Sequence, residues 1–150
     1  MSRGFEEERQ QAVEVIPGLI LGGFYSLDEI LAMNPDAVFP LDHAPGSIWR
    51  SGFRGEIVYY PITDYGILPD DVLDRLVEEI VERLHAGRRV GVFCIGGHGR
   101  TGYVASCVIW RMLGEKKPVA YLREHYSYKS VETLEQENAI ERYQQRHPFG

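Results

Sequence analysis

A cysteine and an arginine lie six positions apart in a segment of the sequence that is rich in glycine. The segment reads Cys94-Ile95-Gly96-Gly97-His98-Gly99-Arg100-Thr101-Gly102. Because three of the residues between the cysteine and the arginine are glycines, the backbone N–H groups can converge on one point. A helix that starts at the end of the segment would add the positive partial charge of its N-terminus. The segment is therefore predicted to cradle an anion of phosphate geometry, with residues 95–100 as the phosphate-binding residues.

Cys94 and Arg100 would have complementary tasks in this cradle. A thiol in a positive field loses its proton more readily than usual, and the resulting thiolate is a strong nucleophile. Arginine offers a planar fork that binds two phosphate oxygens at once and stays charged. The hydroxyl of Thr101 could donate a hydrogen bond to the sulfur when the sulfur acts as the leaving group. A lone cysteine in an apolar strand usually belongs to the core, but a core strand does not need the glycines that follow here.

The same segment also fits a nucleotide-binding pattern, because residues 97–102 read Gly-His-Gly-Arg-Thr-Gly. A dinucleotide-binding fold would then require a second strand that ends in an acidic residue about 20 residues further on. Residues 119–125 predict a helix instead. A Walker-type phosphate loop would require Lys followed by Ser or Thr, which this segment lacks. Both nucleotide-binding interpretations are therefore disfavoured.

Three parts of the chain resemble one protein family. Cys94-x5-Arg100 followed by Thr101 resembles the signature of the protein tyrosine phosphatase superfamily. Residues 15–22 are similar to the first strand of its compact dual-specificity branch, and residues 130–136 resemble the last helix of that branch. The resemblance implies a phosphatase that forms a cysteinyl-phosphate intermediate and uses neither a metal nor another cofactor.

The mechanism of this family needs an acid that protonates the leaving oxygen and later activates water, and Asp64 matches the family's catalytic aspartate. Asp64 lies in residues 61–69, a predicted loop between the apolar run 56–60 and a long helix. An aspartate beside glycine and proline is also a common turn residue, but the cysteine segment favours the catalytic interpretation. Asp70 and Asp71 are rivals, and Asp70 better suits the N-cap of the helix that follows.

Four further residues could affect the site. Phe93 stands where the family usually has a histidine, whose hydrogen bonding supports the cysteine. His98 is interpreted either as a basic group on the rim that favours polyanionic substrates or as a solvent-facing residue that tolerates the turn. Gln136 could position water, as the resemblance implies, or could be an exposed helix residue. Cys107 lies on an apolar helix and is interpreted as a core residue, with a reversible disulfide to Cys94 as the alternative.

The elements that would position these residues alternate between strands and helices in the first part of the chain. Short apolar runs predict strands, and apolar residues at helical spacing predict helices. The predicted strands are 19–21, 37–41, 56–60 and 89–93, and the predicted helices are 26–33, 69–87, 103–113, one from 118, and one from 130 or 133 to about 145. Residues 42–55 predict a surface loop, and residues 1–14 an N-terminal extension or short helix. The fold class is therefore a single-domain α/β fold over residues 1–150, with a central four- or five-stranded mixed sheet flanked by helices.

Composition and charge limit the function classes further. The chain has 150 residues and a formal net charge of −6, which disfavours nucleic acid and anionic membranes as general partners. Its two cysteines do not make a disulfide scaffold or resemble a structural zinc site. No apolar stretch is long enough for a membrane span, and the first residues lack the apolar region of a secretory signal. A cytoplasmic protein is the default expectation.

This chemistry leaves the substrate open. The leading interpretation is a metal-independent phosphatase of phosphoproteins with dual specificity. A short chain implies few rim loops and a shallow pocket, which would admit phosphoserine and phosphothreonine as well as phosphotyrosine. The alternatives keep the chemistry and take a phosphoinositide or an RNA 5′-phosphate, or are a catalytically inactive phosphate-binding module. Intact Cys94, Arg100 and Asp64 argue against the inactive module.

Overall fold

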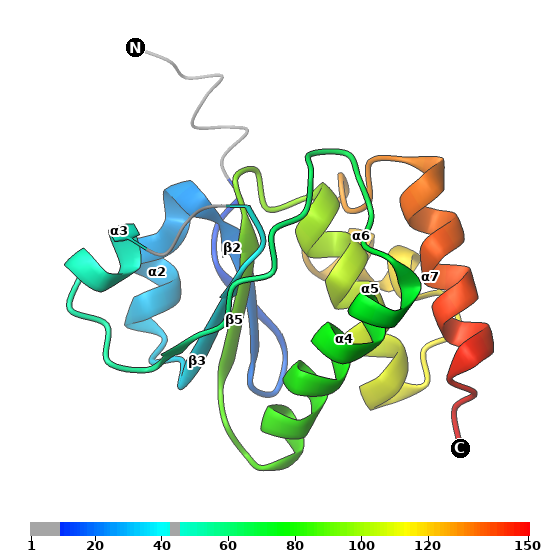
Figure 1. Cartoon of the computed structure of the whole chain (residues 1–150), viewed down its shortest axis with the longest axis horizontal. Coiled ribbons are helices and arrows are strands. Elements are labelled where there is room, and N and C mark those ends of the chain that lie inside the picture. Colours follow the sequence, from blue (N-terminus) through cyan, green and yellow to red (C-terminus); the bar gives the residue numbers. More distant parts are fainter. Residues whose placement is uncertain (1–9, 43–45) are drawn as a thin grey trace.

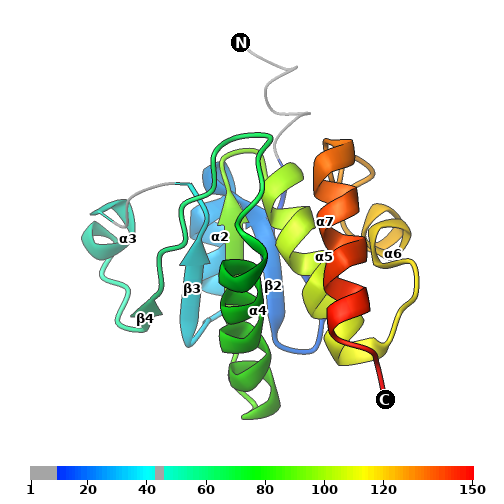
Figure 2. The same cartoon turned by 45° about the vertical axis from the view of Figure 1, so that its right-hand side comes forward.

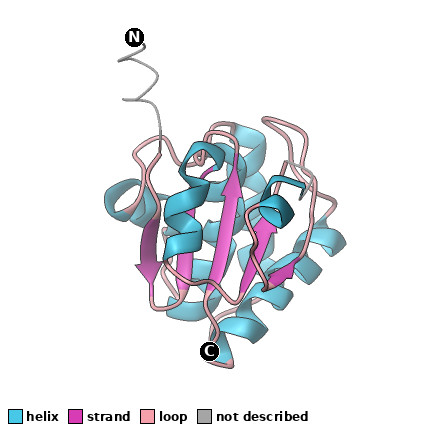
Figure 3. Ribbon diagram, turned by 90° about the vertical axis from the view of Figure 1, so that its left-hand side faces the viewer, coloured by secondary structure: helices cyan, strands magenta, loops and turns pink. Residues whose placement is uncertain are grey.

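The computed structural model describes residues 10–42 and 46–150 of the chain. A central sheet carries helices on both of its faces (Figures 1 and 3). The strands are β1 (Val13–Ile16), β2 (Leu19–Gly23), β3 (Ala37–Pro40), β4 (Glu56–Ile57) and β5 (Val90–Cys94). The helices are η1 (Phe24–Ser26), α2 (Leu27–Ala32), α3 (Gly46–Arg50), α4 (Asp70–His85), α5 (Gly99–Leu113), α6 (Pro118–His125) and α7 (Leu134–Arg146).

The sheet has the strand order β1-β2-β5-β3-β4. Strand β1 runs antiparallel to β2 and all other neighbours are parallel, so the predicted mixed sheet in an α/β fold is confirmed. Strand β5 pairs with β2 on one side and β3 on the other, and its residues are all buried. The carboxyl ends of these three parallel strands meet at one edge of the sheet. That edge is where open α/β sheets bind their ligands.

Two separate cores flank the sheet. Helices α2 and α3 cover one face, and α4, α5, α6 and α7 lie on the other (Figures 1 and 2). Strand β5 contributes side chains to both cores, because successive side chains of a strand point to opposite faces of the sheet. Val92 and Cys94 belong to the larger core on the α5 side, whereas Phe93 belongs to the smaller core with residues of α2 and α3. The predicted nucleophile therefore faces the side of the sheet that carries α5.

The N-terminal hairpin corrects one expectation. The sequence predicts an extension or short helix over residues 1–14, but Val13 and Glu14 lie in β1, which pairs with β2. Gly18 between these strands has φ +89°, a backbone conformation that glycine adopts without steric cost. Residues 1–9 lie outside the described residues.

Two elements between β3 and α4 also differ from the prediction. Strand β4 is only two residues long, although the N–H groups of Val58 and Tyr60 continue the hydrogen bonding to β3. Residues 42–55, predicted as a surface loop, contain α3, whose Ile48 is buried in the smaller core. A loop prediction from Pro, Gly and Ser content fails here because one buried side chain is enough to dock a short helix.

The long helices have the predicted amphipathic or apolar patterns. Helix α4 carries Asp70 and Asp71 in its first turn, where their charges complement the helix dipole. Its N-cap is Pro69, so the prediction that Asp70 is the N-cap is wrong by one residue. Helix α7 has Thr133 as its N-cap. Within the described ranges, the longest apolar helices fall short of what a membrane crossing requires.

Candidate active site

The glycine-rich segment forms a tight loop between the end of β5 at Cys94 and the start of α5 at Gly99. Gly97 has φ +78°, and a Cβ there would come within 2.8 Å of the backbone of Gly22 and Gly23. Glycine is therefore required both by the backbone conformation and by the close approach of β2. The N–H of Gly97 donates to Cys94 Sγ at 3.2 Å, and Cys94 is only 2% exposed. The loop thus turns a backbone donor toward the sulfur, as an anion cradle requires.

Arg100 lies in the first turn of α5, and its side chain is almost fully buried. Its Nη1 donates to the carbonyl of Ile62 at 3.0 Å. Its Nη2 lies 3.1 Å from Asp42 Oδ2 and 3.3 Å from Asp64 Oδ1. The guanidinium therefore brings the predicted acid Asp64 to the loop that begins with Cys94.

Asp42 is a site residue that the sequence reasoning missed. It follows β3 and was assigned to a surface loop, but its side chain is only 5% exposed. Its Oδ2 accepts the N–H of Ile95 as well as pairing with Arg100. Its Oδ1 is buried and has no hydrogen-bond partner within residues 10–42 and 46–150. The available signal was its position, because a polar residue just after a buried parallel strand lies at the ligand-binding edge of the sheet.

Asp64 lies in a tight turn that the N–H of Gly66 closes by donating to the carbonyl of Thr63 at 2.8 Å. Tyr65, at the third position of this turn, has φ +63°, a region that residues other than glycine rarely adopt. The Asp64 side chain is 58% exposed. The turn therefore exposes this carboxyl group at the rim of the site, where the buried guanidinium of Arg100 pairs with it.

The hydroxyl of Thr101 was predicted to bond the sulfur of Cys94. Thr101 is fully buried in the first turn of α5, beside residues 94–100, which are named the phosphate loop after their predicted ligand. Its Oγ1 has no hydrogen-bond partner among the described residues, so this bond is not formed in the structure. Among the described residues, Oδ1 of Asp42 is likewise buried and without a hydrogen-bond partner near the predicted anion cradle.

Residues 126–133 brace the phosphate loop from the side of α6 and α7. The hydroxyl of Tyr126 donates to the carbonyl of Gly97 at 2.6 Å, and burial raises the pKa of Tyr126 well above its ordinary value. The hydroxyl therefore stays protonated and remains a donor. His98 is half-buried, and its Nδ1 lies 2.7 Å from Ser127 Oγ. His98 is therefore held by Ser127 while part of its side chain stays exposed, and both interpretations of this residue stay predictions.

Glu132 is a second acidic residue that the sequence reasoning did not single out. Its carboxylate lies against Gly99, so closely that a Cβ on Gly99 would clash with it. The N–H of Val131, the preceding residue, donates to the carbonyl of His98 at 3.4 Å. These contacts place Glu132 beside the phosphate loop, although it is remote from that loop in sequence.

Gln136 is fully buried, so the alternative of an exposed helix residue is wrong. Its Oε1 accepts the N–H groups of Glu132 and Thr133 in a capping box at the start of α7. Its Nε2 donates to the carbonyl of Gly66 at 3.2 Å. The side chain therefore contacts the loop that carries Asp64.

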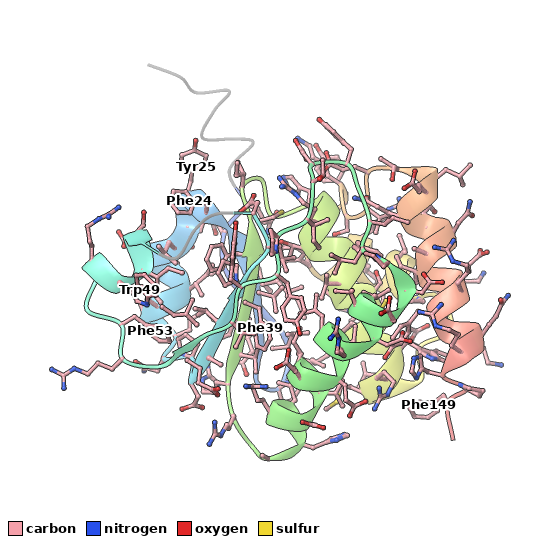
Figure 4. The ribbon with its side chains drawn as sticks, in the orientation of Figure 1. Phe24, Tyr25, Phe39, Trp49, Phe53 and Phe149 are labelled. Carbon is pink, nitrogen blue, oxygen red and sulfur yellow. The ribbon has the colours of Figure 1, made fainter. Side chains whose placement is uncertain are left out.

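The segment after β2 closes the phosphate loop from the other side. The N–H of Phe24 donates to the carbonyl of Ile95 at 3.1 Å. The neighbouring Tyr25 is mostly exposed and points outward at the end of the molecule where β2 ends (Figure 4).

Cys107 belongs to the core, as predicted. It is fully buried on α5, its thiol donates to the carbonyl of Tyr103 at 3.6 Å, and burial raises the pKa of the thiol far above its ordinary value. Both Cys94 and Cys107 are free thiols in the structure. Within the described part of the chain, His, Cys, Asp and Glu side chains form no group of three that could hold a metal ion.

Comparisons with known proteins identify the family of the chain. The family described as "Swiss Army Knife protein, DSP-PTPase phosphatase domain" matches residues 48–148. Two uncharacterized proteins of Methanocaldococcus jannaschii are similar in sequence. MJECL20 is 46% identical over 87 residues, which cover 57% of this chain and 58% of the relative. MJ0215 is 44% identical over 126 residues, which cover 82% of this chain and 70% of the relative. The chain thus spans less than two thirds of the length of MJECL20.

Solved structures of phosphatases and of a phosphatase-like protein share the fold at low sequence identity. The crystal structure of Tk-PTP in the active form matches with a TM-score of 0.78 at 24% identity, over 90% of this chain and 97% of that one. The human tyrosine phosphatase-like serine/threonine/tyrosine-interacting protein matches with a TM-score of 0.72 at 17% identity, over 93% of this chain and 99% of that one. These likenesses show the fold, and the family match carries the assignment. The chain therefore belongs to the cysteine-dependent protein tyrosine phosphatase superfamily, in its compact dual-specificity branch.

Proposed function

We propose that the chain removes phosphate from phosphotyrosine, and also from phosphoserine and phosphothreonine, in protein substrates through a cysteinyl-phosphate at Cys94. The observation that carries the proposal is the ion pair between Arg100 and Asp64. The guanidinium lies 3.3 Å from the Asp64 carboxylate, and Arg100 belongs to the first turn of α5, directly after the loop that begins with Cys94. A nucleophile, an anion clamp and an acid are thereby gathered at one edge of the sheet.

In the first step, Cys94 Sγ attacks phosphorus, and the bond between phosphorus and the leaving oxygen breaks. Arg100 and the N–H groups of the phosphate loop stabilise the charge on the other phosphate oxygens. Asp64 in its protonated form gives its proton to the leaving oxygen, which departs as an alcohol or a phenol.

In the second step, the oxygen of a water molecule attacks phosphorus, and the bond between phosphorus and Sγ breaks. The Asp64 carboxylate takes a proton from this water, which returns the acid to its starting state. Phosphate leaves, and the Cys94 thiolate is regenerated. Each step needs a reduced Cys94, which a reducing compartment such as the cytoplasm provides.

An open rim supports a protein substrate. The Asp64 turn is exposed, and the apolar side chains of Ile95 and Tyr65 are exposed beside it. Such a rim leaves room for a peptide on either side of the phosphorylated residue.

Hydrolysis of 4-nitrophenyl phosphate in the presence of EDTA tests the chemistry. The wild-type protein should turn over, and Cys94→Ser should be inactive. Asp64→Asn should lose roughly 10²- to 10⁴-fold in kcat, because the second step then lacks the base that takes a proton from water. Absence of turnover by the wild type would instead favour a phosphate-binding module. Loss of activity on adding EDTA would contradict the metal-free mechanism.

A panel of substrates then tests the protein specificity. Peptides with phosphotyrosine, phosphoserine or phosphothreonine should be hydrolysed with higher kcat/KM than soluble phosphoinositides or RNA 5′-phosphates. A clear preference for either of the last two would overturn the protein substrate and leave the chemistry intact.

A further inference from the structure

Gln136 connects the start of α7 to the turn that carries Asp64. Its Oε1 accepts the N–H groups of Glu132 at 2.9 Å and Thr133 at 3.3 Å. Its Nε2 donates to the carbonyl of Gly66 at 3.2 Å. One buried amide side chain therefore caps a helix and holds a loop that lies 70 residues earlier in the sequence.

The carbonyl that Gln136 holds belongs to the residue that closes the Asp64 turn. The N–H of Gly66 donates to the carbonyl of Thr63, and a Cβ on Gly66 would come within 2.8 Å of that same oxygen. Glycine is therefore the residue that fits, and its backbone has little stiffness of its own. Tyr65 inside the turn has φ +63°, a conformation that persists only where its surroundings hold it. The turn thus depends on contacts from outside.

Two side chains supply these contacts on either side of the acid. Arg100 bonds the carbonyl of Ile62, two residues before Asp64, and Gln136 bonds the carbonyl of Gly66, two residues after it. Further along the loop, the N–H of Leu68 donates to the hydroxyl of Tyr103 at 3.2 Å.

We infer that Gln136 is a positioning residue that sets the place of the Asp64 carboxyl group, and not a residue that orients the attacking water. The two acceptor positions of its Oε1 are both used by backbone N–H groups, and the side chain has no exposed surface for a water to reach. The inference rests on the proposed role of Asp64 as the general acid.

The variant Gln136→Glu tests this role with little change of volume. Glutamate keeps an oxygen for the N–H groups of Glu132 and Thr133 and replaces the donor that faces Gly66 by a second acceptor. The value of kcat/KM reports the first step alone, in which Asp64 must protonate a weakly acidic leaving group. We expect kcat/KM for phenyl phosphate to fall roughly 10- to 100-fold. With 4-nitrophenyl phosphate, whose leaving group departs readily as an anion, kcat/KM should change little.

Two further variants separate positioning from general destabilisation. Thr133→Ala removes the threonine half of the capping box and leaves the bond from Gln136 to Gly66, so it should lower the Tm without changing the ratio between the two esters. The double variant Asp64→Asn with Gln136→Glu should be no slower on phenyl phosphate than Asp64→Asn alone. An equal loss on both esters, or an unchanged kcat/KM with slower breakdown of the cysteinyl-phosphate, would overturn the inference.

Amide hydrogen exchange gives a second test that does not require activity. In Gln136→Glu, the amides of residues 61–69 should exchange faster than in the wild type, whereas in Thr133→Ala they should not. If the wild type hydrolyses no phosphate ester, the proposed function fails, and this measurement still decides whether Gln136 holds the turn. Unchanged exchange in Gln136→Glu would overturn the inference by itself.

Discussion

The carboxylate of Asp42 lies 3.1 Å from the guanidinium of Arg100, and both side chains are almost fully buried. The same Asp42 oxygen accepts the N–H of Ile95, the first residue after the nucleophile. Asp64 pairs with the same guanidinium from an exposed position. The two carboxylates around one arginine therefore differ in environment, and we expect them to differ in function. Asp42 pairs with Arg100 and accepts the N–H of Ile95 in the phosphate loop, whereas Asp64 is the carboxylate that we propose faces the substrate.

Asp42→Ala should lower the free energy of unfolding by about 3 kcal/mol, because it leaves the buried Arg100 charge and the Ile95 N–H short of a partner. Asp42→Asn should lower the free energy of unfolding by a smaller amount, since the amide oxygen of asparagine can still accept the N–H of Ile95. Urea denaturation measures both losses. Asp64→Ala is the matched control, because an exposed partner of the same guanidinium should contribute about 1 kcal/mol or less. Losses of equal size at positions 42 and 64 would contradict the distinction.

Gly97→Ala should abolish most of the phosphatase activity and lower the free energy of unfolding by about 2 kcal/mol or more. A Cβ at this position meets the backbone of β2, so the phosphate loop has to move away from Cys94. Gly87→Ala provides the control, since Gly87 has a similar φ of +79° and nothing within 4 Å of an added Cβ. It should cost about 1 kcal/mol and leave kcat/KM unchanged. Similar activity in the two variants would show that the contact with β2 is unimportant.

Iodoacetamide should modify Cys94 in the native protein and leave Cys107 unmodified. Cys107 is fully buried, and its raised pKa keeps it in the unreactive thiol form. Mass spectrometry of tryptic peptides distinguishes the two sites, and inorganic phosphate should slow the reaction by occupying the cradle. Alkylation of native Cys94→Ser would mean that Cys107 is accessible, against this prediction.

Stability should depend on pH through Glu14. Hydrogen bonds from Arg89, and after them the N–H of Gly18, hold the pKa of the Glu14 carboxyl below its ordinary value. A carboxylate with a lowered pKa in the folded state stabilises the fold above its unfolded pKa and loses this contribution as pH falls through the folded value. Glu14→Gln should therefore cost about 1 kcal/mol or less at neutral pH, because both side chains are about a third exposed.

The difference between Glu14→Gln and the wild type should be present at neutral pH and disappear at an acidic pH below the lowered folded pKa of Glu14, where the carboxylate takes up its proton. Urea denaturation at the two pH values measures it. A difference that is the same at both values would assign the effect to packing and not to charge.

The local part of the site could be predicted from the sequence, because its residues follow one another. Glycines beside Cys94 and Arg100, between a buried strand and a helix, predict a phosphate loop, and the structure has a tight loop between β5 and α5 at this place. The resemblance to a family predicted Asp64, and the structure places its carboxylate next to Arg100. Asp42 could not be found in this way, because its contacts depend on β3 lying beside β5, and 53 residues separate it from Ile95.

Gln136 shows the same limit. The Thr133-x-x-Gln136 spacing is visible in the sequence as a capping box. A capping box uses the side-chain oxygen of the glutamine and does not predict what its Nε2 contacts. Its burial and its bond to Gly66 follow from how α7 lies against the acid loop. Strand β1 was missed for a related reason, since four residues that alternate weakly become a strand only when β2 pairs with them.

Neighbouring side chains of β5 point to opposite faces of the sheet, so Phe93 and Cys94 meet different structural requirements. Phe93 points into the core with α2 and α3, and Cys94 points to the side of α5. Support for the sulfur comes from the N–H of Gly97, a backbone group that no side-chain replacement at position 93 removes. Phe93 can therefore fill the smaller core without removing the backbone donor that faces the nucleophile.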